Sequence, residues 1–280
     1  MTGVAFHRPS RLDDVLALLA ADEDARPLAG GQTLVPMLNL DLLAPSAIIS
    51  LADIGELRGI DRRDDGSVRI GAMETHARIA ASAAFAGGQA VIPHAAGQIA
   101  SPAIRNFGTI GGACAHGDPA SDWPAALVAA DARIEIAGSS GLRDVAAADF
   151  FQDFLTTALE PGELVTGIVV PPLAGRGIHQ RFSRVDSDYA TVIVACAADI
   201  APDGTCNVVR LAIGACGPHP ARSDTAEALL TGRMLEPALV AQAGQMLAEA
   251  IDPLDDVRGS AAYRRRILPG LIARALESLR

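Results

Sequence analysis

Apolar residues recur along the first fifty positions with the spacing of helices in some segments and of buried strands in others. Leu12, Val15 and Leu19 lie on one face of a helix predicted over 11–21. A strand over 26–29, a Gly-Gly pair, an apolar helix near 34–40 and a strand over 47–51 follow. This stretch therefore predicts a unit in which a glycine loop joins a strand to a helix.

The middle of the chain mixes short strands with longer helical segments. The predicted elements are a hairpin of 59–62 with 68–72 closed by Asp64-Asp65-Gly66, helices over 75–84, 91–100 and 122–131, and strands over 133–137 and 164–170. Pro171-Pro172 ends the last strand, because proline cannot donate to a strand ladder.

The stretch 173–178 holds two glycines and a basic residue, and we place a domain boundary there, with domains over 1–176 and 177–280. Beyond it, two apolar strands are joined by the turn Pro202-Asp203-Gly204, and three helices finish the chain. The predicted ranges are strands over 190–200 and 206–213 and helices over 224–230, 237–251 and 260–279.

Composition narrows the function classes. Half of the 280 residues are hydrophobic, so we expect a substantial core, and the net charge of −10 argues against nucleic acid as a partner. No apolar run reaches the ~18 residues that span a membrane. The N-terminal Met-Thr-Gly-Val-Ala-Phe-His lacks the basic and apolar segments of a signal peptide, so we expect a cytoplasmic protein.

Cysteine and histidine spacing gives no sign of a metal site. No C-x-x-C pair is formed by the four cysteines, Cys114, Cys196, Cys206 and Cys216. The last three lie in apolar segments, where cysteine is usually a small buried residue. The six histidines are scattered without ligand spacing. The pair Asp118/Asp122 lacks a third ligand, so we predict neither a metal site nor an acid–base pair.

Two glycine segments carry the strongest chemical signal. They read Ala29-Gly30-Gly31-Gln32-Thr33 and Thr109-Ile110-Gly111-Gly112-Ala113. Glycine lets successive backbone N–H groups converge on an anion, so two such loops could grip a pyrophosphate from both sides, with Thr33 or Thr109 adding a hydroxyl. The plainer interpretation is two ordinary tight turns. The sequence contains neither a Walker motif nor G-x-G-x-x-G, so a dinucleotide would not bind in the Rossmann mode.

The second segment runs into Asp118-Pro-Ala-Ser-Asp122-Trp-Pro, which has two compatible interpretations. Ser121 or Asp122 can cap a helix that has Pro124 in its first turn. Asp122 can also accept a hydrogen bond from a ribose or ribityl hydroxyl.

These motifs resemble the FAD-binding medium subunit of the xanthine dehydrogenase/carbon monoxide dehydrogenase family, the molybdenum hydroxylases. The resemblance covers almost the whole chain. Its motifs are Ala29-Gly-Gly-Gln-Thr-Leu-Val-Pro-Met37, Thr109-Ile-Gly-Gly112 with Asp118-Pro-Ala-Ser-Asp122, Ser187-Asp-Tyr-Ala190, Gly217-Pro-His-Pro-Ala-Arg222 and Arg258-Gly-Ser-Ala-Ala-Tyr-Arg264.

The resemblance implies an α+β fold: a two-part PCMH-type FAD-binding domain, with subdomains of about 1–53 and 54–176, and then an α+β domain with a three-stranded antiparallel sheet and helices. The flavin would lie between the parts. Val165 and Tyr189 would approach the isoalloxazine, and Arg181 matches a position where relatives often carry a basic residue. The implied FAD-binding residues are Leu28, Ala29, Gly30, Gly31, Gln32, Thr33, Leu34, Thr109, Ile110, Gly111, Gly112, Ala113, Ala115, Asp122, Val165, Arg181 and Tyr189.

This sequence departs from the family pattern in two respects. Relatives usually carry Asn where this chain has Ala113, so one side-chain hydrogen bond is missing or comes from elsewhere. It also lacks the cysteine-bearing insertion of the branch that resembles 4-hydroxybenzoyl-CoA reductase. For Tyr189, a strand-edge position with its hydroxyl in water remains the alternative to a flavin contact.

The function implied by the resemblance is electron relay without a catalytic residue in this chain. A molybdenum cofactor in a large subunit oxidises the substrate, [2Fe-2S] clusters in a small subunit pass electrons on, and FAD delivers them to an acceptor. The assembly would be a dimer of heterotrimers. A stand-alone flavin oxidase and a non-enzymatic binding module are the alternatives. The sequence indicates neither the substrate nor whether the acceptor is NAD, a quinone, a protein or oxygen.

Overall fold

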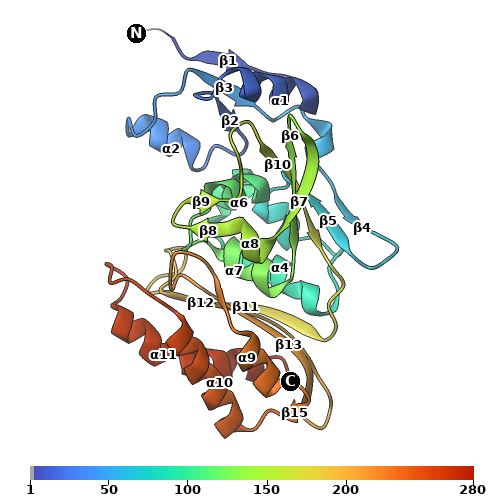
Figure 1. Cartoon of the computed structure of the whole chain (residues 1–280), viewed down its shortest axis with the longest axis vertical. Helices are drawn as coiled ribbons and strands as arrows, with labels where there is room; N and C mark the ends of the chain where they lie inside the picture. The colour runs from blue at the N-terminus through green and yellow to red at the C-terminus, as the bar shows by residue number, and fades with distance from the viewer. Residues whose placement is uncertain (1–2) are drawn as a thin grey trace.

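Three parts follow one another along the long axis of the molecule, in the order of the sequence (Figure 1). The structure is a computed structural model that describes residues 3–280. Met1 and Thr2, the first residues of the segment that we expect not to be a signal peptide, lie outside the described residues.

The N-terminal part is a small parallel sheet with two helices. Its elements are β1 (Ala5–His7), α1 (Leu12–Ala21), β2 (Arg26–Leu28), α2 (Leu34–Asn39) and β3 (Ala47–Ser50). The strand order is β1-β3-β2, and the first glycine segment connects β2 to α2. The predicted strand–glycine–helix–strand unit is confirmed, and β1 adds an edge strand that the sequence pattern did not indicate.

The middle part is built on a five-stranded antiparallel sheet of order β4-β5-β10-β6-β7. Its elements are η1 (Gly55–Leu57), β4 (Ile60–Arg62), β5 (Val68–Gly71), α3 (His76–Ala80), η2 (Gly87–Ala90), α4 (Val91–Gln98), α5 (Pro102–Phe107), α6 (Ile110–His116), α7 (Asp122–Ala129), β6 (Arg133–Gly138), β7 (Gly141–Ala146), α8 (Ala147–Phe150), β8 (Phe151–Asp153), β9 (Thr156–Thr157) and β10 (Leu164–Val170). The second glycine segment, predicted as a loop, forms most of helix α6.

The C-terminal part is an antiparallel sheet with three helices on one face (Figure 1). Its elements are β11 (Arg176–Phe182), β12 (Val192–Ile200), β13 (Thr205–Gly214), β14 (Ala221–Arg222), α9 (Asp224–Leu230), β15 (Arg233–Met234), α10 (Pro237–Ala250) and α11 (Ala261–Glu277). The α+β fold class is confirmed. The three long strands are accompanied by β14 and β15, which are two residues each, and β11 begins at Arg176.

Strand β12 separates two hydrophobic cores. Ile193 and Ala195 face the core that the middle part shares with this sheet, whereas Val194 and Cys196 face the core under α9, α10 and α11. Burial on both faces explains why β12 is apolar at nearly every position instead of alternating. Helix α7 contacts β12 and β13, and every residue of α7 is buried.

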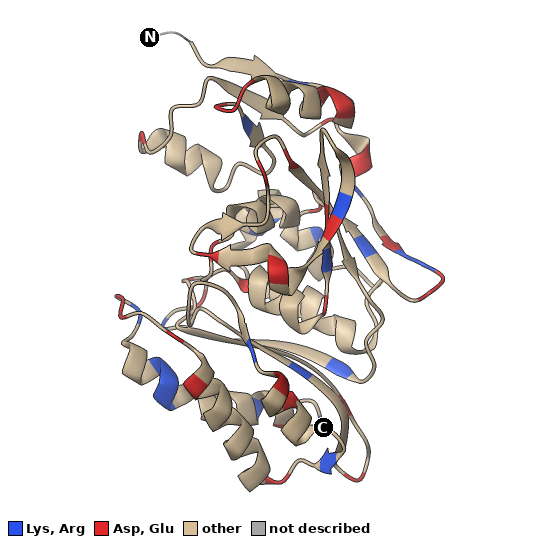
Figure 2. Ribbon diagram, viewed as in Figure 1, with Lys and Arg blue, Asp and Glu red and all other residues tan. Residues whose placement is uncertain are grey.

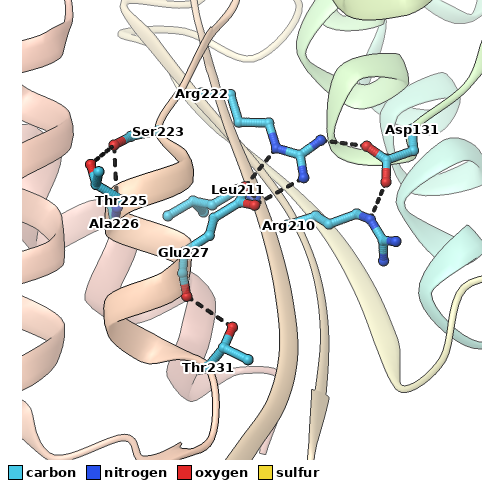
Figure 3. A network of polar contacts seen from close by, with 9 residues as sticks. All are labelled: Asp131, Arg210, Leu211, Arg222, Ser223, Thr225, Ala226, Glu227 and Thr231. Atoms are coloured by element: carbon cyan, nitrogen blue, oxygen red, sulfur yellow. Dashed lines mark hydrogen bonds and ion pairs between the residues drawn. The ribbon is translucent and has the colours of Figure 1, made fainter.

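A polar network fastens the middle part to the C-terminal part (Figure 3). Asp131, just after α7, accepts hydrogen bonds from Arg210 of β13 and Arg222 of β14. Arg222 also donates to Glu227 of α9 at 2.7 and 2.9 Å. These contacts fix the sheet against the end of α7.

Acidic and basic residues are dispersed over all three parts of the ribbon (Figure 2). None of the helices within residues 3–280 is long and apolar enough to cross a membrane. Within that same range, His, Cys, Asp and Glu residues form no group of three or more that could hold a metal ion.

Candidate functional site

A cavity of about 450 Å³ lies between the N-terminal and middle parts. The first glycine segment and α2 form one wall, and α6 with Gly108, which precedes it, forms the other. Among its lining residues are Arg26, Ala29, Gly30, Gly31, Gln32, Thr33, Leu34, Thr109, Gly112, Ala113 and Ala115. The structure therefore brings both glycine segments to one cavity.

The first glycine segment presents a row of free backbone donors. Among the described residues, no protein acceptor receives the N–H groups of Gly30, Gly31, Gln32 or Thr33. Gly31 has φ of +70°, and the Gln32 side chain donates to the Gly30 carbonyl at 3.1 Å. Four unengaged N–H groups beside a cavity form an anion-binding concavity of the kind that suits phosphate oxygens.

Gly30 also allows the two walls to meet. A Cβ added at this position would lie 2.0 Å from the carbonyl oxygen of Phe107, which is the last residue of α5. No other residue type fits there without displacing backbone. The first glycine pair thus combines a close backbone approach at Gly30 with a left-handed turn at Gly31.

The second glycine segment has a different geometry, which corrects the expectation of two equivalent N–H loops. Ile110 N–H donates to the Glu74 carbonyl at 3.0 Å, and Gly111 N–H donates to the Ala72 carbonyl at 2.9 Å. Thr109 caps α6, and its hydroxyl accepts from Gly112 N–H at 3.3 Å while keeping its own hydrogen to donate. The backbone N–H groups of the second glycine segment are thus largely bonded to protein acceptors.

Adjacent residues of α6 face opposite ways. A Cβ at Gly111 would lie 2.5 Å from the Cβ of Ala72, so this glycine packs α6 against the end of β5. A Cβ at Gly112 would meet only the Thr109 hydroxyl at 3.1 Å and the Ala29 Cβ at 3.6 Å, and Gly112 lines the cavity. Gly112 therefore keeps the gap between the two walls open.

A second cavity of about 240 Å³ adjoins the first and extends to the C-terminal part. The residues that line both cavities are Gln32, Thr33, His76, Ala113 and His116. The second cavity is also lined by Asp118, Asp122, Arg181 and Tyr189. The predicted residues of α7 and the C-terminal part are thus joined to the glycine segments by one continuous concave surface.

Asp122 is a buried carboxylate with unused hydrogen-bonding capacity. It is 5 % exposed, and its Oδ1 has no hydrogen-bond partner among the described residues. His179 Nε2 and Arg181 Nη1 each lie 3.5 Å from its oxygens. Burial raises the pKa of Asp122 to about 6, and the nearby Arg181 opposes this rise.

The neighbours of Asp122 differ in charge. Burial, with a further contribution from Arg181, lowers the pKa of His179 to about 3, so the imidazole is neutral at physiological pH. Arg181 donates to the Gln98 carbonyl at 2.5 Å, while its buried Nε has no partner within residues 3–280. Asp122 and Arg181 both line the second cavity, so a polar ligand there would meet a carboxylate and a guanidinium.

Tyr189 stands at the mouth of the second cavity and is 47 % exposed. The Arg258 guanidinium lies 4.9 Å from the centre of its ring. Partial burial and the nearby Asp118 raise the pKa of the Tyr189 phenol. This ring is therefore a neutral aromatic surface that a planar ligand can contact.

Four predicted residues line neither main cavity, and one of them is Gly111, which packs against Ala72. Ile110 is fully buried, and Leu28, at the end of β2, lines neither cavity. Val165 borders a small third cavity of about 120 Å³, together with Ala29 and Gly112. Val165 and Tyr189 thus line different cavities.

Sequence reasoning missed His76, which lines both cavities and is nearly buried. Trp123 Nε1 donates to His76 Nδ1 at 3.2 Å. Burial, with a smaller contribution from Arg105, lowers the pKa of His76 to about 4. No spacing signal marks this residue, because its partners Trp123 and Gly108 come from distant segments.

Family profiles and relatives agree with this architecture. The family described as the FAD binding domain in molybdopterin dehydrogenase matches residues 2–173, and the CO dehydrogenase flavoprotein C-terminal domain matches residues 178–279. The chain is 39% identical to the carbon monoxide dehydrogenase medium chain of Afipia carboxidovorans, covering 97% of this chain and 95% of that one. It is 34% identical to the nicotine 6-hydroxylase medium subunit of Paenarthrobacter nicotinovorans, covering 99% and 97%.

The fold matches solved structures equally well. A chain of quinoline 2-oxidoreductase from Pseudomonas putida 86 superposes with a TM-score of 0.93 at 30% identity, over 99% of this chain and 96% of that one. Both the glycine-segment domain and the C-terminal sheet are thus shared along the full length. The chain belongs to the FAD-binding medium subunits of the molybdenum hydroxylase family.

Proposed function

We propose that this chain carries FAD as an electron-transfer subunit, receiving electrons from [2Fe-2S] clusters of a partner subunit and passing them to an external acceptor. Hydroxylation of the organic substrate would occur at a molybdenum cofactor in a large subunit. The observation that carries the proposal is the row of four free N–H groups at Gly30–Thr33, beside a cavity that continues to the buried Asp122.

The residues present fit a flavin dinucleotide. The N–H groups of the first glycine segment would bind the pyrophosphate, and Gly112 would leave room for it. The carboxylate of Asp122, which lines the second cavity, would accept from a ribityl hydroxyl. Arg181 would supply a buried donor, and the Tyr189 ring would contact the isoalloxazine. The bound flavin supplies redox chemistry, because it accepts electrons singly and donates them singly or in pairs.

Two of the side chains that line the cavities do not change charge near neutral pH. The pKa of His76 lies near 4, and the pKa of Tyr189 lies above its ordinary value. Asp122 differs from them, because burial raises its pKa to about 6. We assign Tyr189 and Asp122 to binding of the flavin, Tyr189 as a neutral group and Asp122 as an acceptor.

We also propose an iron–sulfur small subunit and a molybdenum-cofactor large subunit as partners, in a cytoplasmic dimer of heterotrimers. Relatives named as medium chains support a multi-subunit assembly. Several large apolar side chains beside the cavities are exposed, as expected of surfaces that a partner covers. They are Val35 and Leu40 near α2 and Ile104 and Phe107 on α5.

The test compares the chain alone with the complex that co-purifies with it. The purified chain should show a flavin absorption band near ~450 nm and should oxidise no purine, CO or N-heterocycle. The complex, reduced through its substrate, should bleach that band before the acceptor is reduced. Substrate turnover by the chain alone would favour the stand-alone oxidase, and absence of flavin from both preparations would favour a binding module.

A further inference from the structure

His76 lies where the two cavities meet and is not used in the FAD contacts described above. We infer that His76 is a flavin-binding residue whose imidazole, held by Trp123, donates its Nε2–H to an oxygen of the bound dinucleotide. This inference rests on the proposed FAD site and adds a neutral side-chain donor to it.

The contact with Trp123 determines which nitrogen carries the proton. An indole N–H only donates, so His76 Nδ1 must accept the 3.2 Å hydrogen bond from Trp123 Nε1. A neutral imidazole that accepts at Nδ1 carries its hydrogen on Nε2. Trp123 is fully buried in α7, so this partner is held firmly in place.

The backbone around His76 fixes the direction of the ring. Its N–H donates to the Gly108 carbonyl at 3.0 Å. A Cβ added at Gly108 would lie 2.8 Å from His76 Nε2, so the chain before α6 packs directly against this edge of the ring. The imidazole cannot rotate without displacing either Gly108 or Trp123.

The Nε2–H is left for a ligand. Across residues 3–280 no protein acceptor receives it, and Nε2 is absent from the atoms that are both fully covered and unpartnered, so it keeps accessible surface. His76 lines both cavities together with Gln32 and Thr33 of the first glycine segment. An unpaired donor at this junction needs an oxygen acceptor from the occupant of the cavity.

The charge state matches a donor role. Because burial lowers the pKa of His76 to about 4, the ring is neutral at physiological pH and offers a single hydrogen. A neutral donor adds direction without adding charge beside the four N–H groups of the first segment.

The test is FAD affinity in purified full-length protein, measured by titration of the flavin-depleted chain. His76→Phe keeps an aromatic ring but loses the donor, and we expect its Kd to be roughly tenfold weaker, the effect of ~1.4 kcal/mol. His76→Gln supplies an amide oxygen that can accept from Trp123 and an NH2 group that can donate to the ligand. Its Kd for FAD should remain within about threefold of wild type. His219→Phe, the same change at an exposed histidine, should have no effect.

Histidine-selective ¹⁵N NMR of the wild-type protein provides a readout that does not depend on how the variants fold. We expect the Nε2–H tautomer in the free protein and a shift of that Nε2 signal when FAD is added. An Nδ1–H tautomer, or a His76→Phe variant whose FAD affinity equals that of wild type, would overturn the role of His76 while leaving the FAD site intact. Failure of the wild-type chain to bind FAD would overturn both.

Discussion

Gly111 and Gly112 are neighbours in sequence, yet the structure predicts opposite consequences for the same substitution. An alanine Cβ at Gly111 would lie 2.5 Å from the Ala72 Cβ and 2.8 Å from the Ala72 carbonyl oxygen. The corresponding Cβ at Gly112 has no backbone contact and points into the gap toward Ala29. Gly111→Ala should therefore affect the fold first, and Gly112→Ala should affect ligand binding first.

The expected loss in the free energy of unfolding for Gly111→Ala follows from three contributions. Overpacking against Ala72 costs about 1–3 kcal/mol. Displacement of α6 also weakens the Gly111 N–H to Ala72 carbonyl bond, worth ~0.5–1.5 kcal/mol. Replacing glycine by alanine in a helix returns up to about 1 kcal/mol. Together these contributions lower the free energy of unfolding by about 2 kcal/mol, which corresponds to a Tm lower by roughly 4–8 °C.

Gly112→Ala has the same helix gain and only a moderate contact with the Thr109 hydroxyl at 3.1 Å. Its Tm should equal or slightly exceed that of wild type. Because the methyl group narrows the space between the glycine segments, we expect FAD affinity to fall about tenfold or more, equivalent to ~1.4 kcal/mol of overlap with the ligand.

The assay is thermal unfolding of both flavin-depleted variants, followed by FAD titration at a temperature where both are folded. The pair controls for composition, because each variant adds one methyl group to the same turn of α6. The reasoning is refuted if Gly111→Ala retains the wild-type Tm, or if Gly112→Ala binds FAD as tightly as wild type.

Three further changes test the second cavity. Burial raises the pKa of Asp122 to about 6, above the ~3.9 of an unfolded aspartate. Ionisation of Asp122 therefore lowers the free energy of unfolding above about pH 6, and this loss of stability disappears as the pH falls toward 4. Asp122→Asn should therefore raise the Tm of the flavin-depleted chain at pH 7.5, and a Tm difference from wild type that does not shrink by pH 4.5 contradicts this. Ala113→Asn should hold FAD equally or more tightly, gaining up to ~1 kcal/mol from one hydrogen bond, and a clear loss of affinity in titration means that the backbone is repacked around alanine. Tyr189→Phe should leave FAD content nearly intact but alter the flavin potential or the reoxidation rate, which stopped-flow reoxidation of the assembled complex measures. Unchanged rates together with an unchanged flavin spectrum would make Tyr189 a structural residue only.

The elements that the sequence predicted best are the strands in which most positions are apolar. The apolar stretches that become β12 and β13 stand out because both faces of the sheet are covered. Strand β11 was missed because its seven residues include the polar Arg176, Gln180 and Arg181, so it shows no apolar run. Strand β7 was missed for a similar reason, since its pattern is almost wholly polar or exposed.

The candidate site shows where sequence reasoning reaches its limit. Both glycine pairs look alike along the chain, but only Gly30, Gly31 and Gly112 line the first cavity. Their hydrogen bonding differs because Ala72 and Glu74, which come from another segment, engage the N–H groups of α6 and leave those of the first segment free. Such pairings depend on tertiary contacts, so periodicity and motif spacing do not contain them. The same holds for His76, whose role depends on Trp123 and Gly108.

The second cavity keeps its shape only if the C-terminal part is held firmly against the middle part, because both parts line it. Arg181 and Tyr189 come from that part, whereas Asp122 belongs to α7 of the middle part. Any shift of the sheet against α7 would separate Arg181 from Asp122, which now lie 3.5 Å apart. The ion pairs of Asp131 with Arg210 and Arg222 act at the other end of the same helix (Figure 3). Because α7 is buried throughout and held in this way, it couples the packing of the two domains to the shape of the second cavity.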